Sequence, residues 1–131
     1  MKITTLENSD RRFELSEYER DILVQVATYI HDFFDDLEFS IRHFAKDQAQ
    51  TVRSILEDKQ GEDHQIISKE QTELIFKVFK EAENFVSDLI YDSKIDDNED
   101  FETTCGDLFD ILFENLTTKE EIEEFKKKMN S

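Results

Sequence analysis

Hydrophobic residues recur at three- and four-residue steps along most of this chain, which is the pattern of helices that bury one face. Ser16 and Glu19 have the spacing of a capping box and predict a helix that begins at residue 17. The hydrophobic stripe then continues to residue 57 without a glycine or a proline. Because one helix of that length would be unusual in a small domain, we predict two helices, with the break at Ser40 or within 46–50.

The second half of the chain repeats this pattern after a polar stretch. Residues 58–67 contain Gly61 and read as a loop. Ser68 stands three residues before Gln71, so a second capping box predicts a helix that ends near residue 91.

Two further stripes follow an acidic stretch over 92–100. One predicts a helix over 101–116, and the other predicts a last helix that begins at Thr118. Four to five amphipathic helices with short connections predict an all-α protein, a compact helical bundle. A length of 131 residues fits a single domain, over 16–131, and the scattered apolar residues of 1–15 predict a weakly ordered N-terminal arm.

The net charge of the chain restricts the kinds of partner that it can bind. The sequence has 33 acidic and 16 basic residues, a net charge of −17, whereas solubility asks for a magnitude of only about 2–8. Such a chain repels phosphates and anionic lipids, so we expect no direct binding to nucleic acid and no membrane partner. With no apolar run of spanning length, no signal segment and one cysteine, we expect a cytoplasmic protein.

The acidic residues gather in two places. Residues 92–118 hold nine acids against the single base Lys94. The residues of this first patch that we expect to bind a partner are Asp92, Asp96, Asp97, Glu99, Asp100, Glu102, Asp107 and Asp110. A second patch comprises Asp32, Asp35, Asp36 and Glu38, of which the first three are expected on one solvent-facing helix arc. A solvated surface explains any single acidic run, but the excess of charge favours a strongly basic partner surface.

A calcium loop is the first alternative use of these acids. Asp96, Asn98 and Asp100 match the first, third and fifth positions of an EF-hand. The sixth position, where the turn requires glycine, is Phe101, and the twelfth is Asp107 in place of glutamate. This mismatch argues against an EF-hand.

Catalysis is the second alternative. A helical nucleotide pyrophosphohydrolase would need acidic i, i+3 pairs on facing helices that converge on Mg²⁺. Most of the pairs in this sequence lie away from the apolar stripes and would therefore diverge. The pairs are Asp32/Asp35, Glu70/Glu73, Asp107/Asp110 and Glu121/Glu124. Cys105 falls on an apolar stripe with no histidine nearby in sequence, which predicts a buried structural thiol. His31, His43 and His64 have no zinc spacing. We therefore expect no enzyme, no metal and no cofactor.

The helix over 22–34 is apolar almost all the way round. Such a helix is either central to the bundle or forms a protein interface, including that of a homodimer, and we favour the central position.

Together these features favour an inhibitor that acts by charge mimicry of DNA or RNA. Carboxylates held on helices would occupy the basic surface of a nucleic-acid-binding protein, as expected of a phage- or mobile-element-encoded inhibitor of a restriction or CRISPR nuclease. An immunity protein that neutralises a basic nuclease toxin is an alternative with the same physics. A helical adaptor or regulator that uses an apolar groove is another.

Overall fold

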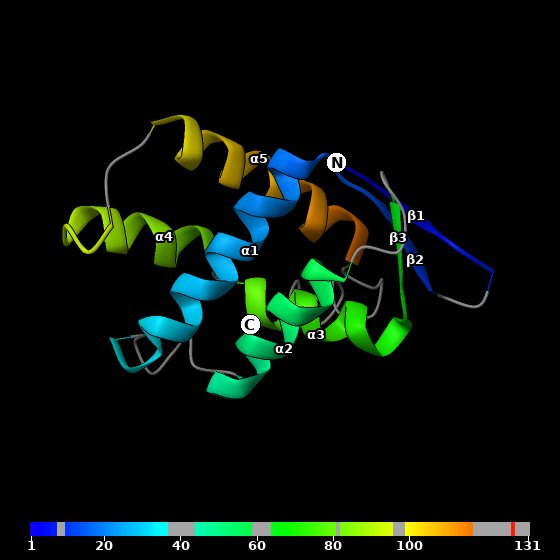
Figure 1. Cartoon of the computed structure of the whole chain (residues 1–131), viewed down its shortest axis with the longest axis horizontal. Coiled ribbons are helices and arrows are strands. Elements are labelled where there is room, and N and C mark those ends of the chain that lie inside the picture. Colours follow the sequence, from blue (N-terminus) through cyan, green and yellow to red (C-terminus); the bar gives the residue numbers. More distant parts are fainter. Residues whose placement is uncertain are drawn as a thin grey trace.

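Helices surround a central helix and pack beside a small antiparallel sheet (Figure 1). The computed structural model describes residues 1–7, 10–36, 44–58, 64–80, 82–95, 99–116 and Lys127. In chain order the elements are β1 (Lys2–Thr5), β2 (Arg11–Glu14), α1 (Glu17–Asp32), the 3₁₀ turn η1 (Phe34–Asp36), α2 (Lys46–Glu57), β3 (His64–Ile67), α3 (Lys69–Phe79), α4 (Ala82–Tyr91) and α5 (Glu99–Leu116).

The sheet shows that the predicted all-α bundle is wrong, because the protein is mixed α and β. Three antiparallel strands run in the order β1-β2-β3. Residues 1–15, which we expected to form a weakly ordered arm, contain two of these strands. The third, His64–Ile67, falls within the stretch 58–67 that we interpreted as a loop, so that prediction is wrong for these four residues.

The register of the strands explains why the sheet is stable against the helices. Ile3 pairs with Phe13, and Phe13 pairs with Gln65 on the other side, so these three side chains form one row across the sheet. All three are buried. Gln65 Nε2 also donates a hydrogen bond to the carbonyl oxygen of Ile55, which ties β3 to α2.

The prediction of two helices over 17–57 is confirmed. The capping box at the start of α1 is formed, because Glu19 N donates to Ser16 Oγ at 3.1 Å and Ser16 N donates to Glu19 Oε1 at 3.0 Å. The chain leaves the α-helix after Asp32, earlier than we predicted, and α2 begins at Lys46, so residues 46–50 begin a helix and do not break one. Ser40 lies outside the described residues.

Helix α1 is the central helix, as we favoured. It packs against α2 along its length and also contacts α4 and α5. Its buried side chains include Ile22, Leu23, Val26, Ala27 and Ile30.

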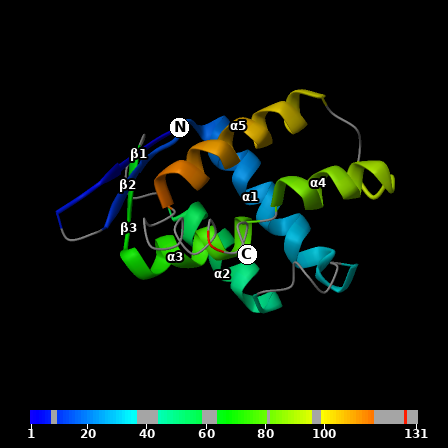
Figure 2. The same cartoon turned by 180° about the vertical axis from the view of Figure 1, so that it is seen from behind.

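The single helix predicted up to residue 91 is wrong, because two helices occupy this stretch. The predicted capping box at Ser68 is confirmed, and it begins α3, which ends at Phe79. Helix α4 begins at Ala82 and lies beside α5 in both views of the molecule (Figures 1 and 2). The break allows α4 to pack on α1 and α5 while α3 packs on α2 and α5.

Helix α5 confirms the prediction of a helix over 101–116. It buries Phe101, Cys105, Leu108, Phe109 and Leu112 against the rest of the core. Arg11 of β2 lies at its C-terminal end, where Nε donates to the carbonyl oxygen of Asn115 at 3.4 Å. The helix predicted from Thr118 lies outside the described residues. None of the described helices combines the length and the apolar character needed to cross a membrane.

Candidate protein-binding surface

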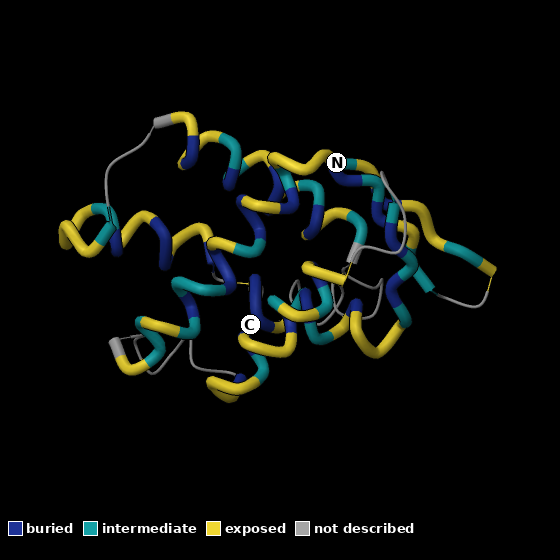
Figure 3. Tube along the Cα trace, in the orientation of Figure 1, coloured by how far each residue is buried: buried dark blue, intermediate teal, exposed yellow. Residues whose placement is uncertain are grey.

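Four carboxylates follow the outer side of α5, opposite its buried side chains. At 3.6 residues per turn they lie within about a quarter of the helix circumference. All four are exposed, and Figure 3 shows the exposed positions of α5 turned away from α1 and α4. We call this set the α5 stripe; it consists of Asp100, Asp107, Asp110 and Glu114.

No base offsets these charges within the helix. The 18 residues of α5 include six acids and no lysine, arginine or histidine. At 1.5 Å per residue this gives roughly one acidic residue per 4.5 Å of helix axis, which approaches the 3.4 Å between phosphates along one DNA strand. The four carboxylates of the stripe itself span 14 residue steps, so they lie about 7 Å apart on average along the axis, roughly half the charge density of one DNA strand, on a rigid element.

The remaining residues of the predicted first patch take different positions. Asp92 is exposed directly after α4. Glu102 is exposed on α5 but lies on another side of that helix, near Cys105. Asp96 and Asp97 lie outside the described residues, and so does the side chain of Glu99, whose backbone begins α5.

The predicted second patch lies on elements other than α5. It follows the C-terminal end of α1, and Tyr29 in the last turn of α1 contacts Phe101 at the start of α5, with ring centroids 6.2 Å apart. The shared helix arc that we predicted is wrong, because Asp32 ends α1 while Asp35 and Asp36 belong to η1. Asp32 and Asp35 are exposed, and Oδ1 of Asp32 lies 3.1 Å from Nδ1 of His31. Glu38 and the side chain of Asp36 lie outside the described residues.

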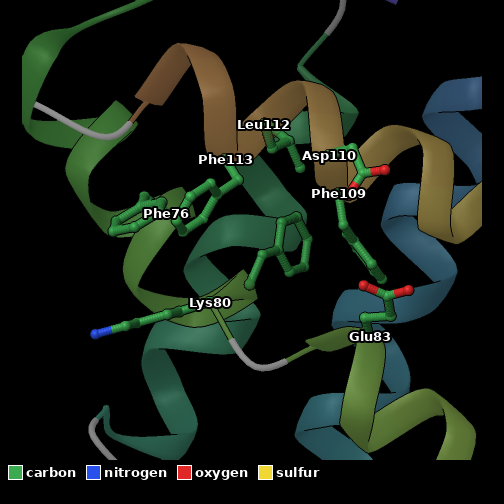
Figure 4. A pocket seen from close by; sticks show the side chains of 8 residues that line it. Phe76, Lys80, Glu83, Phe109, Asp110, Leu112 and Phe113 are labelled. Carbon is green, nitrogen blue, oxygen red and sulfur yellow. The ribbon is translucent and has the colours of Figure 1, made fainter. Parts of the chain in front are cut away.

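A pocket with aromatic walls opens beside the stripe, between α3, α4 and α5 (Figure 4). Two phenylalanine pairs form it, Phe76 with Phe113 and Phe79 with Phe109, each with ring centroids 6.0 Å apart. Phe79 and Phe109 are buried, whereas Phe113 is 47% exposed. Asp110 of the stripe also lines this pocket, which makes the two features continuous.

Glu83 adds a second carboxylate to the pocket from α4. It lies against α5, because a Cβ atom placed on Gly106 would be 3.6 Å from Glu83 Oε1. Lys80 lines the pocket as well, but its side chain extends away from Glu83 (Figure 4).

Cys105 is a buried thiol, as predicted. Burial, together with the nearby charges of Glu102 and Glu83, raises the pKa of Cys105 to about 12. The thiol therefore stays protonated at neutral pH. Nucleophilic chemistry needs the thiolate, which this environment disfavours.

The stretch that matches part of an EF-hand does not form a calcium loop. Asp100, Phe101 and Asp107 all belong to α5, and Phe101 is buried. Over the described ranges, no group of three or more histidine, cysteine, aspartate or glutamate side chains is placed to hold a metal ion.

Sequence reasoning missed three residues of this surface. Glu114 was counted in the acidic stretch but not among the binding residues, although its spacing of four from Asp110 places both on one helix face. Glu83 and Phe113 had no local signal, because the pocket joins three helices that are separate in the sequence. Comparisons with protein-family models, curated protein sequences and solved structures give no match.

Proposed function

We propose that this protein is a non-catalytic inhibitor that binds the basic, nucleic-acid-binding surface of another protein. The carboxylates of α5 take the place of phosphates, so that nucleic acid and inhibitor compete for one surface. The supporting observation is the α5 stripe, an exposed row of four carboxylates on a helix that contains no base. A rigid helix holds these charges in fixed positions, which lowers the entropy lost on binding.

The charge of the whole molecule supports the same function. A net charge of −17 accelerates the approach to a basic partner and makes the association sensitive to salt. The proposed partner is a restriction or CRISPR nuclease, with the inhibitor encoded by a phage or a mobile element. A basic nuclease toxin, with this chain as its immunity protein, would use the same surface, and the identity of the captured partner separates the two. We place the complex in the cytoplasm, where either nuclease acts.

The test compares two variants that each lose three charges. The stripe variant carries Asp107→Asn, Asp110→Asn and Glu114→Gln. The control variant carries Asp21→Asn, Asp58→Asn and Glu73→Gln, which neutralise exposed residues on other elements. Each protein is immobilised, exposed to a nuclease-treated bacterial lysate, eluted with a salt gradient and analysed by quantitative mass spectrometry.

We expect the unmodified protein and the control variant to retain the same basic nucleic-acid-binding protein at low salt. The stripe variant should retain it on the order of tenfold less, because the steering charges at the contact are gone. Equal retention and equal elution salt for the two variants would place the binding surface away from α5.

A further inference from the structure

The aromatic pocket beside the stripe has the size of a site for one side chain. Its volume is about 110 Å³. Pockets for small molecules are usually about 300–1,000 Å³, so a free metabolite of ordinary size does not fit. A single long side chain projecting from a partner surface does.

The walls and the rim of the pocket differ in character. Phenylalanine rings from α3 and α5 form the walls, with Phe79 and Phe109 buried and Phe113 exposed at the edge. Two acidic residues, Glu83 of α4 and Asp110 of α5, also line the pocket, and the Phe109 side chain lies between them (Figure 4). Aromatic faces and carboxylates both attract a cation, and together they favour a cationic group over a neutral apolar one.

Arginine fits this combination better than lysine. Its guanidinium is planar and weakly hydrated, so it stacks on aromatic rings while its N–H groups bond to carboxylates. The lysine ammonium is a strongly hydrated point charge that loses more when it leaves water. Lys80 is the one cationic side chain among the described residues that line the pocket, and it extends away from Glu83 (Figure 4).

We infer that this pocket receives an arginine side chain of the basic partner and anchors the complex. The inference rests on the proposed function, because Asp110 belongs both to the α5 stripe and to the pocket. The stripe then supplies long-range attraction, and the pocket supplies the desolvated contact that holds the partner after encounter.

The experiment titrates the full-length protein with three amino acids whose backbone ends are blocked, so that only the side chain can carry a charge. The probes are acetyl-arginine methylamide, acetyl-lysine methylamide and the neutral acetyl-norleucine methylamide. Ring signals of isotope-labelled phenylalanine are followed by NMR. We expect saturable shifts of the rings that line the pocket with the arginine probe, weaker shifts with lysine, and none with norleucine. Glu83→Gln and Phe113→Leu should each weaken arginine binding about two- to fivefold. The control variant Tyr18→Leu, which alters an exposed aromatic residue outside the pocket, should not.

Three results would overturn the inference. Norleucine binding as tight as arginine binding would make the pocket a general apolar site. Ring shifts that depend on protein concentration without any probe would make a second copy of the chain the occupant. The absence of any shift with arginine would show that the pocket does not accept a cation.

Failure of this inference can be told apart from failure of the proposed function. If the stripe variant loses the lysate partner while Glu83→Gln and Phe113→Leu retain it at unchanged salt, only the pocket inference is overturned. If the arginine probe binds but the stripe variant still captures the same proteins, the pocket remains a cation site and the mimicry proposal fails.

Discussion

Gly106 lies in the interior of α5, where glycine has no conformational role that the structure shows. Its φ is not positive, and a Cβ atom there would make an ordinary contact with Glu83 Oε1 at 3.6 Å. A helix with glycine in its interior is less stable than the same helix with alanine. The reason is that glycine gives the unfolded chain more conformational entropy, which is lost on folding.

We therefore predict that Gly106→Ala raises the free energy of unfolding by about 0.5–1 kcal/mol. Urea denaturation followed by circular dichroism measures the change. A loss of stability would mean that the contact between α4 and α5 at Glu83 is tighter than an added methyl group allows.

Cys105 provides a prediction on alkaline stability. The native thiol has a pKa of about 12, raised by burial from 9.0, whereas the unfolded thiol keeps the ordinary value. Between these values the native state holds a proton that the unfolded state has lost. The contribution of the Cys105 thiol to the free energy of unfolding is thus fully present below pH 9. Above pH 9 that free energy falls by about 1.4 kcal/mol per pH unit.

The check compares the unfolding free energy of the unmodified protein and Cys105→Ala from pH 8 to pH 10.5 under reducing conditions. Removal of the sulfur lowers stability at every pH, but the alanine variant should lose less as the pH rises. Parallel curves for the two proteins would show that the native thiol titrates near its ordinary pKa.

At the scale of elements, the arrangement of acids on α5 is unfavourable for the helix itself. Asp110 lies three residues after Asp107 and four before Glu114, so like charges are helical neighbours. Glu114 also lies in the last turn, where the helix dipole disfavours a negative charge. A helix selected for stability alone would carry lysine or arginine in these places.

The stripe variant should consequently be more stable than the unmodified protein. We expect a gain of about 0.5–1.5 kcal/mol from two relieved repulsions and the dipole. The control variant, which loses the same charge on other elements, should gain less than half as much in the same thermal and urea measurements. A stripe variant that is less stable than the control would mean that these carboxylates have stabilising partners in the folded chain.

The helices and the strands differed in how well the sequence predicted them. Helix starts at Ser16 and Ser68 were predictable because their capping boxes are local and both are formed. Strands β1 and β2 each bury a single residue, Ile3 and Phe13, so no alternation marks them as strands. A local signal was the run Asn8-Ser9-Asp10 in the sequence between them, because these residue types favour turns.

The candidate surface was predictable only in part, for a related reason. The acidity of 99–116 is a property of one helix, and helical spacing shows which acids share a face. The pocket depends on the break between α3 and α4, which no glycine or proline marks and which tertiary packing imposes.

At the scale of the whole molecule, self-repulsion at a net charge of −17 lowers the stability of the compact state. Salt screens this repulsion, since the Debye length falls from about 30 Å at 0.01 M to about 3 Å at 1 M. We predict that Tm rises by several degrees as sodium chloride is raised over this range. The stripe variant, with three fewer charges, should show a smaller rise. A Tm that falls with salt would contradict this, because it would require net attraction among the surface charges.

The central claim is that this protein occupies the nucleic-acid-binding surface of its partner. The most direct measurement loads the immobilised protein with its lysate partner at low salt and then elutes with duplex DNA or with polyglutamate. Polyglutamate competes for basic charge alone, whereas DNA also fits the partner's binding site. We predict that DNA releases the partner at a charge concentration on the order of tenfold lower than polyglutamate does. Release by the two polyanions at equal charge, or retention of the partner while it binds DNA, would contradict mimicry.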